Sequence, residues 1–239
     1  MSNPGSSDHR RSARVPVALE LEYRSAGAFL VAYSTNLSKG GIFVETSTPL
    51  PIGTVVAMRL HAPNTPVCEI NGSVAWLRPE STGPGQPAGM GIVVETAADQ
   101  YGGVVDQIAF SFTGIHILLG TGEPAPRAII SRYLRSILAC RIIDVDYTAG
   151  LDTLPANIDL AVIDLDSSGP EGAQLIQNLR FDARTSTTPI IALGQLERDR
   201  MRAHQRGADE AITNPPLFAE LQGAVIRCIA KPTTVRKPG

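Results

Sequence analysis

Two short polar motifs near the start of the chain carry residue types that bind anions. The first has Arg10 and Arg14 four residues apart, and the second, within TNLSKGGIFVET, has Asn36, Ser38 and Gly41. Guanidinium groups offer planar donor forks to phosphate oxygens and guanine edges, and their flat faces stack on bases. Taken separately, the first motif also fits a solvated basic tail, and the second fits a tight connection into a strand. Their significance therefore depends on the elements that position them.

From about residue 15 to residue 94 the pattern predicts β-strands. VPVALELEY alternates apolar and polar side chains, as a half-buried antiparallel strand does. Turn clusters such as PLPIG and APNTP separate further short runs, which favours a small closed barrel. The further strands are expected at Phe29–Tyr33, Ile42–Glu45, Val55–Leu60, Cys68–Leu77 and Gly91–Val94, with a closing helix near Ala97–Ala109.

After about Gly114 the period changes. GIHILLG, CRIIDVD, DLAVIDL, TPIIALG and EAITN are short strand candidates, and helix-like segments separate them. Strands that alternate with helices pair in parallel through right-handed crossovers. The sequence therefore predicts a two-domain chain, a β-barrel followed by a five-stranded doubly wound α/β domain.

Composition excludes several classes of protein. The chain has 239 residues, 43% of them hydrophobic and 18% charged, which is typical of folded domains. Its net charge of −2 creates no basic field for nucleic acid or an anionic membrane. No apolar run approaches the roughly 18 residues of a membrane span, and the first residues lack the apolar core of a signal peptide. Three widely spaced cysteines fit reduced thiols, show no metal-ligand spacing and favour a cytoplasmic location.

The two motifs together resemble the PilZ domain, the bacterial receptor module for cyclic di-GMP. That family has R-x-x-x-R followed by [D/N]-x-S-x-x-G, and both motifs are complete here, with later GSVAWLR and GIVVE strands that also fit. The resemblance implies a six-stranded antiparallel barrel with a C-terminal helix. It also implies that cyclic di-GMP binds to Arg10, Arg14, Asn36, Ser38 and Gly41. Accessory contacts are expected from Arg11 and Lys39.

The second half resembles the receiver domain of response regulators. Asp164, at the end of the third strand of this half, stands at the phosphoacceptor position. A receiver also has an acidic pair for Mg²⁺ after its first strand, a hydroxyl residue after its fourth and a lysine before the fifth-strand proline. These positions read Gly120-Thr121-Gly122, Gly194 and Asn214, so three of the four parts are absent. We therefore expect a degenerate receiver in which Asp164 is vestigial and no metal binds.

A rival interpretation concerns LLGTGEPA, residues 118–125. A strand followed by G-x-G-x-x-A resembles a Rossmann dinucleotide fingerprint, with Asp144 or Asp146 as the ribose ligand. However, Pro124 and Pro126 remove backbone N–H groups where a pyrophosphate needs them. No Ser/His/Asp or Cys/His set follows from the spacing of the four histidines, so we expect no enzyme and no cofactor.

The leading hypothesis is a cytoplasmic signalling effector that binds cyclic di-GMP. Its pseudo-receiver would relay the bound state to a protein partner in control of motility, polarity or surface behaviour, with a homodimer as one form of assembly. An adaptor that binds no nucleotide and a phosphorylation-responsive regulator stay open as alternatives. The expected boundaries are a tail at 1–8, the barrel at 9–112, the pseudo-receiver at 113–231 and a tail at 232–239.

Overall fold

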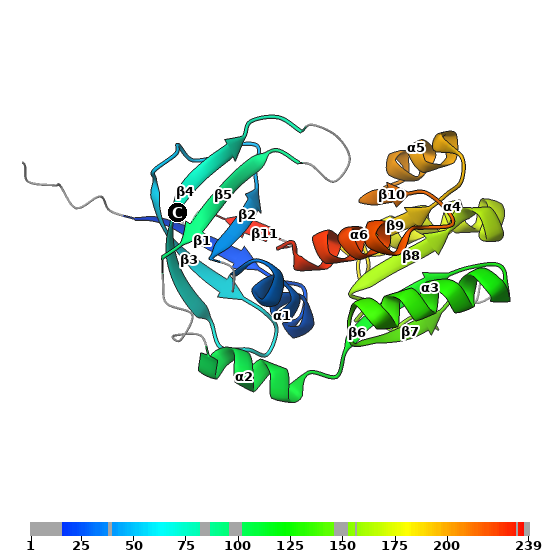
Figure 1. Cartoon of the computed structure of the whole chain (residues 1–239), viewed down its shortest axis with the longest axis horizontal. Coiled ribbons are helices and arrows are strands. Elements are labelled where there is room, and N and C mark those ends of the chain that lie inside the picture. The colour runs from blue at the N-terminus through cyan, green and yellow to red at the C-terminus, as the bar shows by residue number, and fades with distance from the viewer. Residues whose placement is uncertain are drawn as a thin grey trace, which may run out of the picture.

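The computed structural model describes residues 16–37, 40–81, 87–95, 102–145, 153–155, 157–232 and 234–236. Two units lie side by side in Figure 1, an N-terminal half up to residue 111 and a C-terminal half from residue 115. The strands are β1 Val17–Glu22, β2 Gly41–Glu45, β3 Val55–His61, β4 Cys68–Arg78, β5 Gly89–Val94, β6 Ile115–Gly120, β7 Cys140–Asp144, β8 Leu160–Asp164, β9 Ile190–Leu193, β10 Glu210–Ile212 and β11 Thr234–Arg236. The helices are α1 Ala26–Thr35, α2 Gly102–Ser111, α3 Pro124–Ile137, α4 Leu165–Phe181, α5 Glu197–Gln205 and α6 Phe218–Ala230.

The N-terminal half is a curled mixed sheet, which differs from the expected closed antiparallel barrel of six strands. The order is β11-β1-β3-β4-β5-β2, in which β11 and β2 are the edge strands among the described residues, and the N-terminal half contributes five of these strands. The β1–β3 pair is parallel, while β3–β4, β4–β5 and β5–β2 are antiparallel. The prediction of six antiparallel strands from this half was therefore wrong, although strands over the expected ranges from Ile42 to Val94 are confirmed.

The missing strand is a helix. Residues Phe29–Tyr33, expected as a strand, lie inside α1. The helix begins after Ser25, whose side chain accepts a hydrogen bond from the Ala28 backbone N–H at 3.1 Å and so satisfies a free helical donor. Two residues of this helix, Phe29 and Ala32, are buried in the core. A helix thus replaces the expected strand, and within the described ranges β2 pairs only with β5, at the edge of the sheet.

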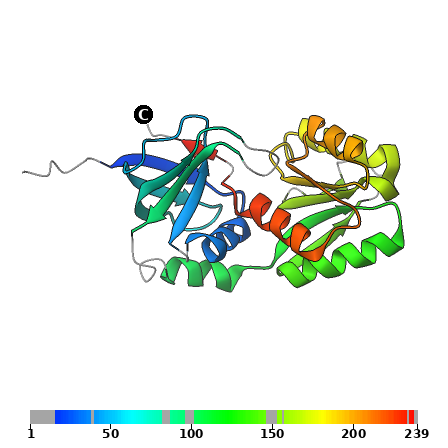
Figure 2. The same cartoon turned by 45° about the horizontal axis from the view of Figure 1, so that its top comes forward.

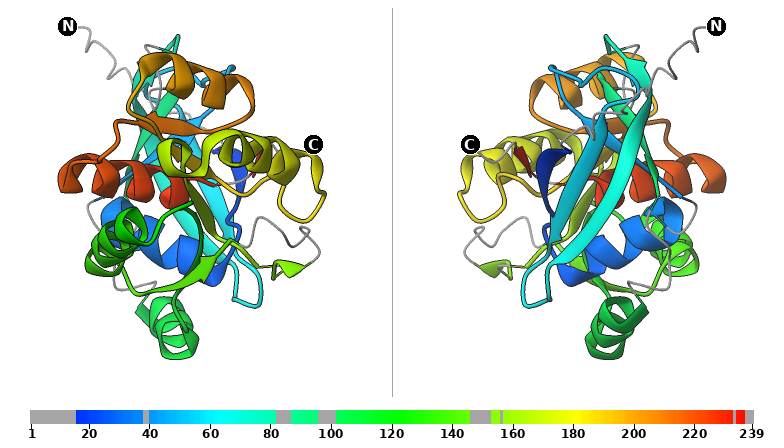
Figure 3. Two further views of the ribbon diagram at one scale, coloured as in Figure 1. Left: turned by 90° about the vertical axis from the view of Figure 1, so that its right-hand side faces the viewer. Right: turned by 90° about the vertical axis from the view of Figure 1, so that its left-hand side faces the viewer.

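The C-terminal half confirms the predicted doubly wound sheet. Its five parallel strands follow the order β10-β9-β8-β6-β7, which is 5-4-3-1-2 when the strands are numbered within this half. That is the flavodoxin-like order. Successive residues of β6, β8 and β9 enter two different apolar clusters, because alternate side chains face opposite sides of the sheet. Figure 3 looks along this half, with helices on both faces of the sheet.

The two halves share one hydrophobic core. The larger cluster of buried side chains combines β1–β5 and α1 with β6, β8, β9, α3 and α6. Helix α1 packs against α6, and Figure 2 shows these two helices together at the junction. Gly27 of α1 is tightly enclosed, since a Cβ there would lie 2.7 Å from Ile115 Cδ1 on β6. The halves are therefore packed together as well as joined by the chain.

The end of the chain returns to the first sheet. Beyond α6, β11 pairs antiparallel with β1, with Val235 opposite Leu21. This strand lies within the residues expected to be a tail, 232–239, and it supplies the sixth strand of the sheet. None of the helices in the described part of the chain combines the length and apolar character that a membrane span requires.

Candidate functional site

The polar turn after α1 is fixed by backbone hydrogen bonds at both ends. Asn36 caps α1 through its N–H to the Ala32 carbonyl at 3.0 Å, and Gly41 N–H donates to the Asn36 carbonyl at 3.3 Å. The Gly40 carbonyl accepts from Val94 N–H at 2.8 Å, which ties the turn to β5. The left-handed conformation falls at Gly40, with φ of 82°, and Gly41 instead begins β2. A Cβ at Gly41 would make an ordinary van der Waals contact, at 3.5 Å, with the Ile92 carbonyl oxygen, so packing alone does not require glycine there.

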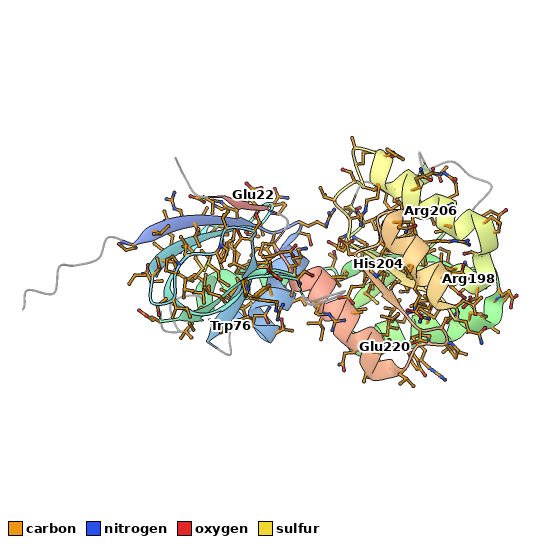
Figure 4. The ribbon with its side chains drawn as sticks, turned by 90° about the horizontal axis from the view of Figure 1, so that it is seen from above. Glu22, Trp76, Arg198, His204, Arg206 and Glu220 are labelled. Atoms are coloured by element: carbon orange, nitrogen blue, oxygen red, sulfur yellow. The ribbon has the colours of Figure 1, made fainter. Side chains whose placement is uncertain are left out.

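Beside this turn, two aromatic rings and an arginine form what we call the aromatic platform, Phe43, Trp76 and Arg78. The Phe43 and Trp76 rings stack, with centroids 5.3 Å apart and planes 16° apart. The Arg78 guanidinium carbon lies 5.0 Å from the Phe43 centroid and 5.6 Å from the Trp76 ring. Trp76, labelled in Figure 4, is 45% exposed. Stacked rings with an adjacent cation offer a surface on which a planar base can stack.

The platform exists because two glycines on β5 leave room for it. Phe43 and Trp76 both pair with Gly91, from opposite sides of β5. A Cβ at Gly91 would meet Trp76 Nε1 at 2.0 Å, and one at Gly89 would meet Phe43 Cζ at 2.6 Å. The rings therefore lie directly over the glycine backbone of the middle strand.

The alternation of side chains in the sequence does not predict the platform, because β4 contains a β-bulge. The register of β4 against β5 shifts between Val74 and Trp76. Strict alternation would place Trp76 on the inner face with Val74, whereas the bulge turns it outward to the face of Phe43. A signal was available in GSVAWLR, where Ala, Trp and Leu follow one another and break the alternation.

Two cavities adjoin the platform. The smaller, of about 290 Å³, is lined by the turn, the platform rings and β5, with Asn36 and Gly41 among its residues. The larger, of about 850 Å³, lies between the halves, and we call it the junction cavity. Asn36, Phe43 and Trp76 line both. The described part of the second motif and the aromatic platform thus meet at one place.

Arg24, just after β1, crosses the junction beside the larger cavity. Its guanidinium donates to Thr187 Oγ1 at 2.7 Å and to Thr188 Oγ1 at 3.2 Å, both in the C-terminal half. Its Nε is buried without a hydrogen-bond partner among the described residues. Burial lowers the pKa of this guanidinium, although arginine stays charged at neutral pH. The residue links the strand that follows the arginine motif to the second half.

The remaining predicted ligand residues lie outside the described residues. These are Arg10, Arg11, Arg14, Ser38 and Lys39. The structure therefore brings Asn36 and Gly41 beside the platform, and the contacts of the arginine pair stay a prediction.

Asp164 lies at the carboxyl end of β8 and is fully buried. It caps α4, since its Oδ1 accepts from the Asp166 and Ser167 N–H groups at 3.1 and 3.3 Å. Its Oδ2 accepts from Ser167 Oγ at 2.6 Å, and Asn214 Nδ2 donates to Oδ1 at 2.8 Å. Both oxygens are thus engaged by neutral donors. In the described ranges, no group of three or more His, Cys, Asp or Glu side chains is placed to hold a metal ion.

Known structures similar to the chain include two receiver domains of histidine kinases and a chemotaxis protein. One is the magnesium-bound receiver domain of a sensor histidine kinase from Pseudomonas aeruginosa PAO1, at 27% identity and TM-score 0.44, covering 49% of this chain and 99% of that one. Another is the signal receiver domain of a Clostridium thermocellum histidine kinase, at 21% identity and TM-score 0.42, covering 50% and 99%. A third is the Vibrio cholerae chemotaxis protein CheY4, at 16% identity and TM-score 0.42, covering 48% of this chain and 98% of that one.

The family comparison concerns the other half of the chain. No curated protein sequence matches the chain significantly. Residues 8–111 match the family described as PilZ domain, and this range contains both polar motifs, the platform and the whole N-terminal sheet except β11. The chain therefore contains a PilZ domain at residues 8–111, followed by a half with the flavodoxin-like strand order.

Proposed function

We propose that the chain is a non-enzymatic bacterial signalling effector that binds cyclic di-GMP through its PilZ domain. The observation that carries the proposal is the match over residues 8–111 with both ligand motifs complete. Arg10 and Arg14 bind the phosphates and a guanine edge, while Asn36, Ser38 and Gly41 receive the ligand from the sheet side. Arg11 and Lys39 assist. The position of Asn36 and Gly41 on a cavity beside exposed stacked rings supports this assignment.

The aromatic platform gives the ligand's bases a place to stack. Trp76 presents an indole face beside the turn, and Arg78 adds a guanidinium within reach of the same surface. A guanine that stacks there would lie next to the Asn36 amide, which has no side-chain hydrogen-bond partner among the described residues. Stacking on an aromatic side chain contributes about 1–3 kcal/mol per base. We therefore add Trp76 to the proposed ligand residues.

The C-terminal half acts as a protein-contact module. The hydrogen bonds that engage both oxygens of Asp164, and the substitution of the receiver lysine by Asn214, argue against control by phosphorylation. The bound state passes to a protein partner in the cytoplasm, and the outputs we expect are motility, polarity or surface behaviour. The shared core gives a physical route, because a change at the sheet face is transmitted through α1 to α6.

Isothermal titration of cyclic di-GMP into the full chain tests the proposal. We expect binding that weakens as salt rises, since phosphate contacts are electrostatic. Arg14→Ala should weaken affinity about tenfold or more, because it removes charge-assisted hydrogen bonds. Arg198→Ala is the matched control, because this α5 arginine lies on the C-terminal half with its side chain 71% exposed (Figure 4). If the native chain gives no heat, the adaptor without nucleotide replaces this proposal.

A further inference from the structure

The junction cavity joins the proposed ligand site to a wall made by the C-terminal half. Its volume of about 850 Å³ falls within the roughly 300–1,000 Å³ of small-molecule sites. On one side it has the turn residue Asn36 and the platform. On the other it has residues of the C-terminal half with both signs of charge, namely Asp159, Asp209, Glu210, Arg227 and Lys231. A ligand held against the platform would therefore face the second half across this space.

The cationic groups of this second wall retain donors that their present partners do not use. Arg227 donates from Nε and Nη2 to the two oxygens of Glu210, both at 2.7 Å, and its side chain is 50% exposed. Guanidinium has five N–H donors, so this pairing leaves further ones for another acceptor. Lys231 pairs across the junction with Glu45 of β2, and its side chain is 49% exposed. An ammonium has three N–H donors, so the Lys231 ammonium can also donate to a second anionic partner.

We infer that the cyclic dinucleotide binds between the two halves, with Lys231 and Arg227 of the C-terminal half contacting its second phosphate. This inference rests on the proposed function, since it extends the ligand site across the junction. The ligand has two phosphates on opposite sides of its macrocycle. One is assigned to the arginine motif, and the other faces away from it, where a separate cation can contact it. The wall formed by Arg227 and Lys231 supplies that cation on the far side of the same cavity.

The position of Lys231 makes the inference specific. It immediately follows α6, the helix that packs on α1, and it already contacts the face of β2 that carries Phe43. A phosphate that binds the Lys231 ammonium beside Glu45 connects the two halves through one ligand. Binding therefore strengthens the contact between the PilZ domain and the C-terminal half.

The test compares the two partners of one ion pair. Lys231→Ala and Glu45→Ala each break the Lys231–Glu45 pair, which is a partly exposed contact of small stabilising effect. Cyclic di-GMP affinity is measured by isothermal titration for both variants and for the native chain, with thermal unfolding to verify that each is folded. We expect Lys231→Ala to weaken affinity about tenfold, as loss of a charge-assisted contact does. We expect Glu45→Ala to keep affinity within about twofold or to raise it, because it removes a competing carboxylate and leaves the cation.

Arg227→Gln and Glu210→Gln repeat the comparison at the second pair, and only the arginine change should weaken binding. Equal effects of the two changes within each pair would overturn the inference and reduce the cavity to a junction between packed domains. In that outcome the proposed function stands if Arg14→Ala still weakens binding. Absence of binding by the native chain would instead remove the proposed function and this inference together.

Discussion

Asn214 donates from a single amide nitrogen to Asp164 Oδ1 and to Asp166 Oδ2, each at 2.8 Å. The Gln195 N–H also donates to Asp166 Oδ2, at 2.9 Å, and Gly122 N–H donates to Ser167 Oγ at 3.0 Å. The segments that follow β6, β9 and β10 are therefore joined by hydrogen bonds to the end of β8 and the first turn of α4, around one buried carboxylate. A lysine in place of Asn214 would bring a positive charge on a long side chain. The Asn214 amide instead donates two hydrogen bonds and carries no charge.

Asp164 should stay unmodified by small-molecule phosphodonors. The carboxylate is fully buried and both oxygens accept hydrogen bonds, so a phosphoryl donor could reach an oxygen only by breaking these contacts. Incubation with acetyl phosphate and Mg²⁺, followed by intact-mass measurement, should show no added phosphoryl group. The Asp164→Ala chain provides the background, and a phosphoryl adduct found only in the native chain would contradict the expectation.

Asn214→Ala should destabilise the fold by about 1–3 kcal/mol, because it removes two hydrogen bonds to the carboxylates of Asp164 and Asp166. Urea unfolding of the full chain measures the change. The matched control is Asn178→Ala on α4, an exposed residue whose side chain accepts one hydrogen bond from Gln174 at 2.9 Å. That substitution should cost only about 0.5 kcal/mol or less. Equal losses in the two variants would show that the Asn214 contacts add no special stability.

Gly91→Ala should displace the Trp76 ring, because the new Cβ would lie 2.0 Å from its Nε1. Trp76 is the single tryptophan of the chain, so intrinsic fluorescence reports its environment directly. We expect a shifted emission maximum and a loss of stability of about 1–3 kcal/mol from overpacking. Gly194→Ala is the control, since its nearest neighbour would be 3.4 Å away. An unchanged spectrum for Gly91→Ala would mean that Trp76 is not seated over β5.

Stability should fall in alkaline solution. Burial raises the pKa of the Cys68 thiol to about 11 and raises the pKa values of Cys228 and Tyr23 above their ordinary values. The folded chain therefore holds these protons more tightly than the unfolded chain does. The resulting stability is complete below the ordinary thiol pKa of about 8.5 and is lost as the pH rises toward 11.

Urea unfolding at about pH 7.5, 9 and 10 measures this loss. Cys68→Ala serves as the comparison, because it removes one of the titrating groups and should make the decline less steep. A free energy of unfolding that rises between these pH values would contradict the assignment of buried, protonated thiols.

The parts of the fold that the sequence predicted well are those with a clear period. The five strands of the C-terminal half are short apolar runs between helical segments, a pattern that predicts parallel pairing through right-handed crossovers but does not fix the strand order. The secondary structure of Phe29–Tyr33 was harder to predict from the sequence. All five of its residues are apolar or aromatic, so the sequence shows neither the alternation of a strand nor the 3.6-residue period of a helix. The deciding signal is the N-terminal cap of the helix by Ser25. Local hydrogen bonding selected the helix there.

The site divides in a similar way. Asn36 and Gly41 could be identified from a motif because their spacing is local. The platform depends on the register of three strands and on a bulge beside Trp76, and such long-range pairing leaves only a weak trace in the sequence. The junction cavity could not be foreseen, because it requires the packing of α1 on α6 and the reach of Lys231 to Glu45.

The pairing of β11 with β1 closes the chain into a ring of contacts. A single cleavage between α2 and β6 would cut the direct connection, yet the halves would stay joined through α6 and β11. The PilZ domain thus takes one edge of its sheet from the far end of the sequence. Its complete sheet is a discontinuous unit, so a fragment ending near residue 111 would leave β1 as an exposed edge open to pairing with other chains.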